Sequence, residues 1–221
     1  MFYPWRFAAS FRNDLRMPHR EAIALLALCG ALCATALADS SEPPAHHQAI
    51  VQAQRSERLY TVPEVKLVRQ DGKRISLADE LNDDRPVVMN FIYTSCTSIC
   101  PLSSQIFEQF QKSLGTASRD VHLVSISIDP EQDSPGKLRE YASQFDAGPG
   151  WDHYTGTLND SQTVQRAFGA YFGDKMSHVP LTLMRLAPGK PWVRFDGFVS
   201  AEQLLAERQR WGAPTSARLT Q

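Results

Sequence analysis

Two cysteines separated by three residues, Cys96 and Cys100, carry the most specific chemistry that the sequence offers. They follow an apolar run, 86–93, that is typical of a buried strand, and they precede residues with helical apolar spacing. A rise of about 1.5 Å per residue places the two Cα atoms about 6 Å apart on a helix, within the range of a disulfide. The same spacing lets both sulfurs bind one soft metal ion or act as a redox pair. Spacing alone therefore leaves all three chemistries open.

Alternating strands and helices are expected to position these cysteines. The predicted strands are 62–68 and 73–77, joined by an Asp-Gly turn, then 86–93, 121–128, 151–157, 181–186 and 192–198. The predicted helices run from Cys100 to about Leu114, from a cap at Ser134 through Phe145, from a cap at Asp160 or Ser161 to about Phe172, and from Ala201 to about Trp211. This order predicts an α/β, thioredoxin-like sandwich with an extra amino-terminal β-hairpin. In that fold the cysteines lie at the carboxyl edge of the sheet, where open α/β sheets place their sites.

His178 is the candidate third ligand. It precedes a Val-Pro pair and the predicted strand 181–186, a position that lies beside the cysteine turn in a thioredoxin-like fold. The amino end of a helix favours thiolates, and two thiolates with one imidazole suit Cu(I) and can also hold Cu(II). Thioredoxin-like oxidoreductases separate their cysteines by two residues, so the three residues here favour a metal. A structural zinc site would want a fourth ligand.

Three segments are similar to the Sco/SenC family of copper proteins. They are FIYTSCTSICP at 91–101, SISIDP at 125–130 and WDHYTGT at 151–157, within a similarity that spans about residues 61–211. The resemblance implies that Cys96, Cys100 and His178 are the metal ligands, with copper bound as Cu(I), Cu(II) or both. It also implies a chaperone that delivers copper to the dinuclear centre of cytochrome c oxidase, with subunit II or another copper-receiving protein as partner.

A second class of function uses the same atoms. Cys96 and Cys100 would then be the redox-active pair of a thiol-disulfide oxidoreductase that keeps a partner's copper-site cysteines reduced, itself served by a thiol reductant partner. Many family members have Asp before the histidine and Ser after it, whereas this chain has Ser before it and Val-Pro after it, closer to the cis-proline element of thioredoxins. A peroxidase is disfavoured, because peroxiredoxins place Thr three residues before the reactive Cys and Thr94 lies two before Cys96.

Other polar residues have simpler expected roles. His122 alternates with apolar residues on a predicted strand and is expected to pack in the core, and His153 is expected to be structural. Asp129, in an Asp-Pro pair after a strand, is expected to form a turn, with electrostatic tuning of the site as the alternative. The corresponding alternatives for the site are an inert local disulfide for the cysteines and a hydrogen-bonded loop histidine for His178.

The amino terminus predicts export. Arg16 and Arg20 precede an apolar stretch, 22–38, that ends in Ala-Leu-Ala, the pattern of a cleaved signal peptide. Residues 1–38 are therefore expected to be removed, with Met17 as an alternative start, leaving a soluble periplasmic protein. Anchoring to the inner membrane by the uncleaved segment is the alternative. The remaining divisions are a flexible tether at 39–57, a thioredoxin-like copper-binding domain at 58–212 and a disordered tail at 213–221.

Composition limits the remaining classes of function and partner. The 221 residues are 43% hydrophobic and carry a formal net charge of −1, which is typical of one globular domain with flexible ends. Because the chain has no basic excess, nucleic acid is not an expected partner. Cys29 and Cys33 leave with the signal, so the exported protein keeps an even number of cysteines, as suits an oxidising compartment.

Overall fold

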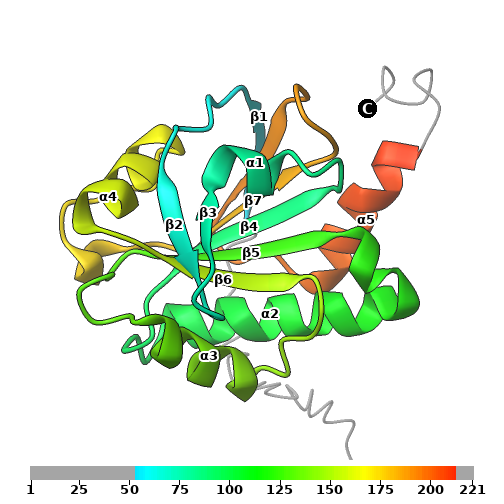
Figure 1. The fold of residues 1–221 in the computed structure, drawn as a ribbon. Coiled ribbons are helices and arrows are strands. Elements are labelled where there is room, and N and C mark those ends of the chain that lie inside the picture. The colour runs from blue at the N-terminus through cyan, green and yellow to red at the C-terminus, as the bar shows by residue number, and fades with distance from the viewer. Residues whose placement is uncertain (1–52, 213–221) are drawn as a thin grey trace, which may run out of the picture. The chain divides into compact units, whose positions relative to one another are not determined.

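One eight-stranded sheet with helices on both faces forms the part of the chain that the computed structural model describes, residues 53–212 (Figure 1). The strands are β1 (Gln54–Arg58), β2 (Lys66–Arg69), β3 (Arg74–Ser76), β4 (Val87–Ile92), β5 (His122–Ser127), β6 (Trp151–Thr155), β7 (Leu181–Arg185) and β8 (Trp192–Asp196). The α-helices are α1 (Leu77–Leu81), α2 (Ile99–Leu114), α3 (Pro135–Gln144), α4 (Leu158–Ala167) and α5 (Ala201–Gly212). Two 3-10 helices, η1 (Gly115–Asp120) and η2 (Lys175–Ser177), complete the elements.

The centre of the sheet is parallel and its flanks are antiparallel. The strand order is β1-β8-β7-β4-β5-β6-β2-β3, with β4, β5 and β6 parallel to one another. Every residue of β4 and β5 is buried, as expected for strands covered on both faces. The hairpin of β2 and β3 is added through an antiparallel pairing of β2 with β6. The predicted thioredoxin-like α/β sandwich with an amino-terminal β-hairpin is confirmed.

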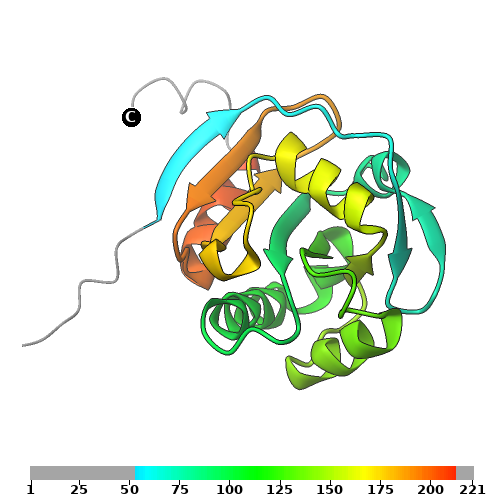
Figure 2. The same cartoon turned by 90° about the vertical axis from the view of Figure 1, so that its left-hand side faces the viewer.

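Helices α2 and α3 lie on one face of the sheet, and α4 lies on the other (Figures 1 and 2). Right-handed crossovers from β4 to β5 and from β5 to β6 require α2 and α3 to share a face. Helix α2 buries Phe107 and Phe110, and the Phe107 ring packs on Trp151 of β6 with centroids 5.8 Å apart. Each such buried side chain contributes about 1.5–3 kcal/mol of hydrophobic free energy. This packing fixes the start of α2, and therefore the cysteine turn, against the sheet.

Most helix ends follow from local signals. The Ser134 hydroxyl caps α3 by accepting a hydrogen bond from the amide of Lys137 at 3.3 Å. Ser200 and Gln203 exchange two hydrogen bonds, 2.8 and 3.2 Å long, at the start of α5, as their spacing predicts. Gly115 ends α2 with a φ of 56°, a conformation that suits glycine.

The prediction for α4 was wrong at both ends. The cap is Thr157, whose Oγ1 accepts from the amide of Asp160 at 3.1 Å, so the helix begins before the expected Asp160 or Ser161. The helix ends at Ala167, because Gly169 adopts a φ of 63° and turns the chain well before residue 172. The residues after this turn line a cavity beside the cysteine edge.

Part of the expected tether belongs to the sheet. Residues 54–57, expected within a flexible segment, lie in β1, which pairs antiparallel with β8. Arg55 Nε donates to Glu207 Oε2 of α5 at 2.8 Å and fastens this edge strand. The strand carries no apolar alternation, so only its tertiary partners reveal it. The expectations for the signal peptide 1–38, the start at Met17, the tether 39–52 and the tail 213–221 fall outside the described residues.

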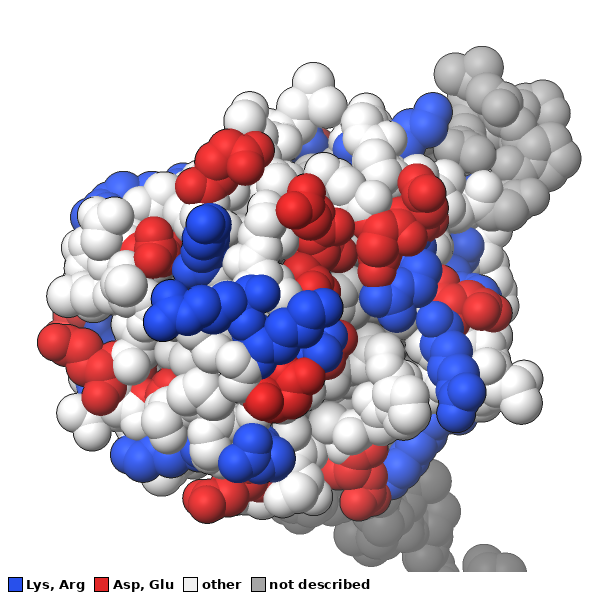
Figure 3. All heavy atoms as spheres, in the orientation of Figure 1, with Lys and Arg blue, Asp and Glu red and all other residues white. Residues whose placement is uncertain are grey.

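Charges of both signs are interspersed on the face drawn in Figure 3, with Lys and Arg beside Asp and Glu. This mixture matches the near balance of 23 basic and 24 acidic residues in the sequence. Among residues 53–212, no helix has the length and apolarity needed to cross a membrane.

Candidate functional site

The two cysteines lie together in the turn between β4 and α2. Both are buried and neither forms a disulfide. The Sγ of Cys96 accepts a hydrogen bond from the amide of Cys100 at 3.5 Å. Ser98 occupies the N-cap position of α2, but its side chain does not cap the helix. The sulfur of Cys96 therefore satisfies a backbone donor that the first turn of a helix leaves unpaired.

The surroundings shift the pKa values of the two thiols in opposite directions. Burial raises the pKa of Cys96, but hydrogen bonds from the amides of Cys100 and Ser98 outweigh it and lower that pKa from 9.0 to about 7. Burial raises the pKa of Cys100 far above its ordinary value, and the neighbouring Cys96 raises it further. Cys96 is therefore the thiol that ionises near neutral pH, and Cys100 stays protonated in the absence of a metal or oxidant.

A buried carboxylate that the sequence did not single out holds this turn in place. Asp133, fully buried after β5, accepts hydrogen bonds from the amide and hydroxyl of Thr94 at 3.2 and 2.6 Å. It also accepts from the hydroxyl of Ser127, at 2.6 Å. The turn before Cys96 is thus bonded to the carboxyl end of β5. In the sequence Asp133 follows the SISIDP segment, but nothing local distinguishes it from a loop carboxylate.

His178 follows η2 and is buried with one ring nitrogen engaged. Its Nε2 lies 3.0 Å from the backbone oxygen of Phe91, at the end of β4. A carbonyl only accepts, so Nε2 carries the proton and Nδ1 keeps its lone pair. Burial lowers the pKa of the imidazole, while the Phe91 bond opposes that shift. Nδ1 has no hydrogen-bond partner within residues 53–212, and metal-binding histidines use this arrangement.

Among the described residues the two cysteines lie together, but His178 does not form a complete three-ligand site with them. No group of three or more His, Cys, Asp or Glu side chains in residues 53–212 is placed to hold a metal ion. The donor chemistry nevertheless fits a soft metal, because two thiols and an imidazole nitrogen without a partner lie at one edge of the sheet. Binding through all three groups therefore requires a rearrangement around His178.

A cavity of about 340 Å³ opens beside His178. Asp129, Phe172 and Lys175 are among its lining residues. Lys175 Nζ donates to Asp129 Oδ2 at 2.6 Å, and it lies 5.7 Å from the ring centroid of Tyr93. The backbone oxygen of Asp129 also accepts from two following amides, so its predicted role as a turn former is confirmed and the ion pair is added to it.

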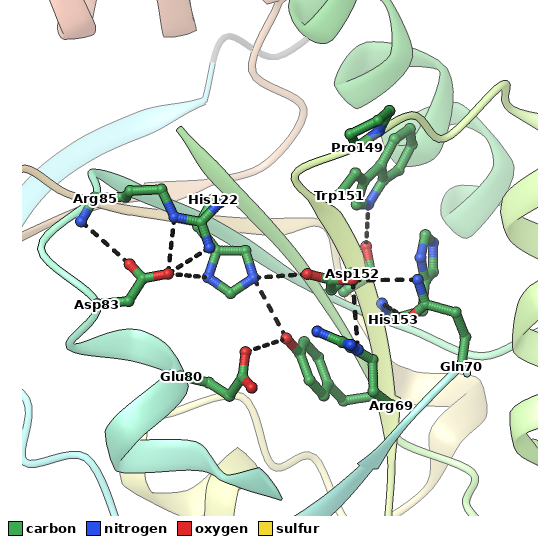
Figure 4. A network of polar contacts seen from close by, with 12 residues as sticks. Arg69, Gln70, Glu80, Asp83, Arg85, His122, Pro149, Trp151, Asp152 and His153 are labelled. Atoms are coloured by element: carbon green, nitrogen blue, oxygen red, sulfur yellow. Dashed lines mark hydrogen bonds and ion pairs between the residues drawn. The ribbon is translucent and has the colours of Figure 1, made fainter. Parts of the chain in front are cut away.

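The other two histidines predicted to be structural are fully buried away from the cysteines. His122 Nε2 lies 3.2 Å from Asp152 Oδ2 (Figure 4). The same nitrogen lies 3.3 Å from the hydroxyl of Tyr154. His153 stacks on Trp151 with centroids 5.2 Å apart, and burial lowers its pKa to about 4. Both predictions are confirmed.

Comparisons with known proteins agree with one another. The family model described as SCO1/SenC matches residues 53–210. The SCO1 protein homolog of Bacillus subtilis is 35% identical over 98 residues, which are 44% of this chain and 50% of that protein. The mitochondrial SCO1 homolog 1 of Arabidopsis thaliana is 26% identical over 139 residues, 59% of this chain and 40% of that protein. The matches thus cover half or less of these relatives' own length.

Solved structures show the same similarity in three dimensions. Bradyrhizobium japonicum ScoI with copper bound has a TM-score of 0.56 and 25% identity, over 66% of this chain and 95% of that one. BsSco, described with a disulfide switch as a member of the Sco family of cytochrome c oxidase assembly proteins, has a TM-score of 0.60 and 25% identity, over 70% and 95%. Yeast Sco1 with copper bound, at 20% identity and a TM-score of 0.58 over 74% and 96%, shares the fold.

Proposed function

This chain belongs to the SCO1/SenC family, and from that premise we propose that it is a copper-binding chaperone for the assembly of cytochrome c oxidase. The observation that carries the proposal is the pair of free thiols at the start of α2, one of them with a pKa lowered to about 7. A thiolate is the form that binds a soft metal, so the site is prepared for copper at neutral pH. The copper-bound ScoI structure supports the same reading.

Cys96, Cys100 and His178 are the proposed ligands for this copper cargo, as Cu(I), Cu(II) or both. The Phe91 carbonyl leaves the lone pair of His178 on Nδ1, so Nδ1 is the atom that would bind. Copper must displace the proton of Cys100, whose burial disfavours the free thiolate, and binding is therefore coupled to proton release.

The proposed recipient is subunit II of cytochrome c oxidase or another copper-receiving protein. We place the working form outside the cytoplasm, in the periplasm, because the predicted signal peptide supports export. In that oxidising compartment the dithiol must be reduced before it loads copper, so a thiol reductant partner is part of the proposal.

The difference in pKa between Cys96 and Cys100 favours a second candidate function. It is a thiol-disulfide oxidoreductase that acts on a partner's copper-site cysteines. The Cys96 thiolate would attack a sulfur of the partner's disulfide, form a mixed disulfide and release one partner thiolate. Cys100, losing its proton, would then attack Cys96, release the second partner thiolate and close the Cys96–Cys100 disulfide. The partner is reduced by two electrons and this chain is oxidised by two.

Two measurements on the same protein separate these functions. The reduced full-length chain, with Cys29 and Cys33 replaced by Ser to leave only the site thiols, is titrated anaerobically with Cu(I) against a chromophoric chelator. It is then mixed with a purified copper domain of oxidase subunit II. A chaperone binds one copper and transfers it, while the metal-free form reduces generic disulfides slowly. Fast reductase turnover without transfer would reject the chaperone in favour of the oxidoreductase.

A further inference from the structure

One methionine lies in an unusual environment beside the dithiol. Met176, in η2, is 73% exposed, whereas Met89 and Met184 are fully buried in β4 and β7. An exposed thioether contributes little to the hydrophobic core, so packing does not account for its position. Methionine sulfur is also a soft ligand that never carries a proton at physiological pH, and it therefore remains available for Cu(I).

The sulfur of Met176 is linked to that of Cys96 through one hydroxyl group. The hydroxyl of Tyr93 donates to Met176 Sδ at 3.7 Å. The same hydroxyl contributes to the lowering of the pKa of Cys96, so it also lies near that thiol. Both sulfurs therefore lie around a single phenol oxygen. Since that oxygen carries one proton, it serves one sulfur at a time, and a bond to Cys96 leaves the lone pairs of Met176 free.

The backbone of Met176 is fixed while its side chain reaches solvent. Asp174 caps η2, with its Oδ1 accepting from the amide of Met176 at 2.9 Å. The neighbouring Lys175 is bonded to Asp129 at 2.6 Å. The short helix thus holds the exposed thioether beside the hydroxyl of Tyr93.

We propose that Met176 is an additional copper ligand, which joins Cys96 and Cys100 to give a three-sulfur set for Cu(I). The inference rests on the proposed copper-binding function and deepens it. In the described part of the chain no His, Cys, Asp or Glu side chain completes a group of three with the two cysteines. Met176 would supply the third ligand. A thioether adds no charge and favours Cu(I) over Cu(II), so Met176 biases the site toward the reduced ion.

The direct test is X-ray absorption at the copper edge on selenomethionine-labelled protein. The full-length chain with Cys29→Ser and Cys33→Ser is reduced and loaded with one Cu(I). A copper–selenium contribution is expected, which Met176→Leu removes and Met184→Leu, a matched change inside β7, retains. Copper bound through sulfur with no selenium contribution overturns the role of Met176 and leaves the chaperone proposal intact. A reduced parent protein that binds no copper overturns the chaperone proposal itself.

A competition titration gives the second readout. Met176→Leu conserves volume at an exposed position, so folding is retained. We expect it to weaken Cu(I) binding about tenfold, or about 1.4 kcal/mol, and to change Cu(II) binding less than twofold. Met184→Leu should leave both affinities at the parental values. Equal Cu(I) affinities in the Met176→Leu and parent proteins would show that the thioether does not bind the metal.

Discussion

A buried histidine lies at each end of the parallel strands β4 and β5, and the two differ in the groups that face their ring nitrogens. At the amino end, His122 pairs with Val87 and directs its ring nitrogens toward two carboxylates, Asp152 at 3.2 Å and Asp83 at 3.7 Å (Figure 4). At the carboxyl end, His178 bonds through Nε2 to a backbone oxygen and leaves Nδ1 without a partner among the described residues. Carboxylates face the histidine at one end, whereas a single backbone oxygen is the hydrogen-bond partner of the histidine at the other.

Along this one pair of strands, His122 is expected to stabilise the fold, and His178 is the proposed copper ligand. Burial raises the pKa of Asp152, but the His122 hydrogen bond and the charge of Arg69 outweigh it and keep the carboxyl ionised. The contacts of His122 with Asp83 and Asp152 join the loop before β4 to β5 and β6. An unpaired buried polar atom costs about 1–3 kcal/mol, a cost that a ligand bound to Nδ1 of His178 would remove.

The largest effect is expected from the cysteines. Replacing Cys96 or Cys100 with Ser should lower copper affinity by on the order of a hundredfold or more, because a neutral hydroxyl is a poor ligand for a soft metal. Anaerobic titration of the variants measures this loss, and circular dichroism checks that they fold. Retention of tight copper binding by either folded variant would place the metal elsewhere.

His122→Ala should destabilise the protein without touching the metal site. The change removes a partner of Asp152 and Tyr154 and opens a cavity, at a cost of about 2–4 kcal/mol in the free energy of unfolding. Urea unfolding at neutral pH measures the loss. Copper stoichiometry should be unchanged, and a variant that kept full stability would show that the network contributes nothing to the fold.

His178→Ala should give the converse result. It is expected to weaken copper binding about tenfold, or about 1.4 kcal/mol, since it removes the Nδ1 ligand. Stability should fall by less than in His122→Ala, because His178 has one hydrogen bond to lose, to Phe91, and its unpaired Nδ1 is removed with it. Titration and urea unfolding of the same preparation check both halves. Unchanged affinity together with a large loss of stability would make His178 a structural residue like His122.

The smallest effect is a pH dependence of the metal-free dithiol. Alkylation of Cys96 should rise through a midpoint near pH 7, where its thiolate forms, while Cys100 remains unreactive there. Because the folded pKa of Cys96 lies below its ordinary 9.0, its contribution to stability is complete above about pH 9 and is lost as the pH falls through about 7. Mass-spectrometric alkylation profiles report each thiol separately, and equal midpoints would remove the asymmetry that favours the oxidoreductase.

The sequence by itself determined most of the strands and helices and the position of the dithiol, because these rest on local signals. The buried runs of β4 and β5, the caps at Ser134 and Ser200, and the dithiol at the start of α2 follow from apolar periodicity, from side chains that bond amides three residues away, and from spacing. These signals need no knowledge of distant partners, and the predicted sandwich followed from them.

Only the tertiary structure decided which distant groups meet. The polar strand β1 forms because β8 and Glu207 offer partners, and Asp133 holds Thr94 across 39 residues of chain. The phenol of Tyr93 meets Met176 from 83 residues away. Hydrogen bonds of this range depend on where the sheet and its loops bring side chains together, and a local sequence pattern carries no record of that geometry.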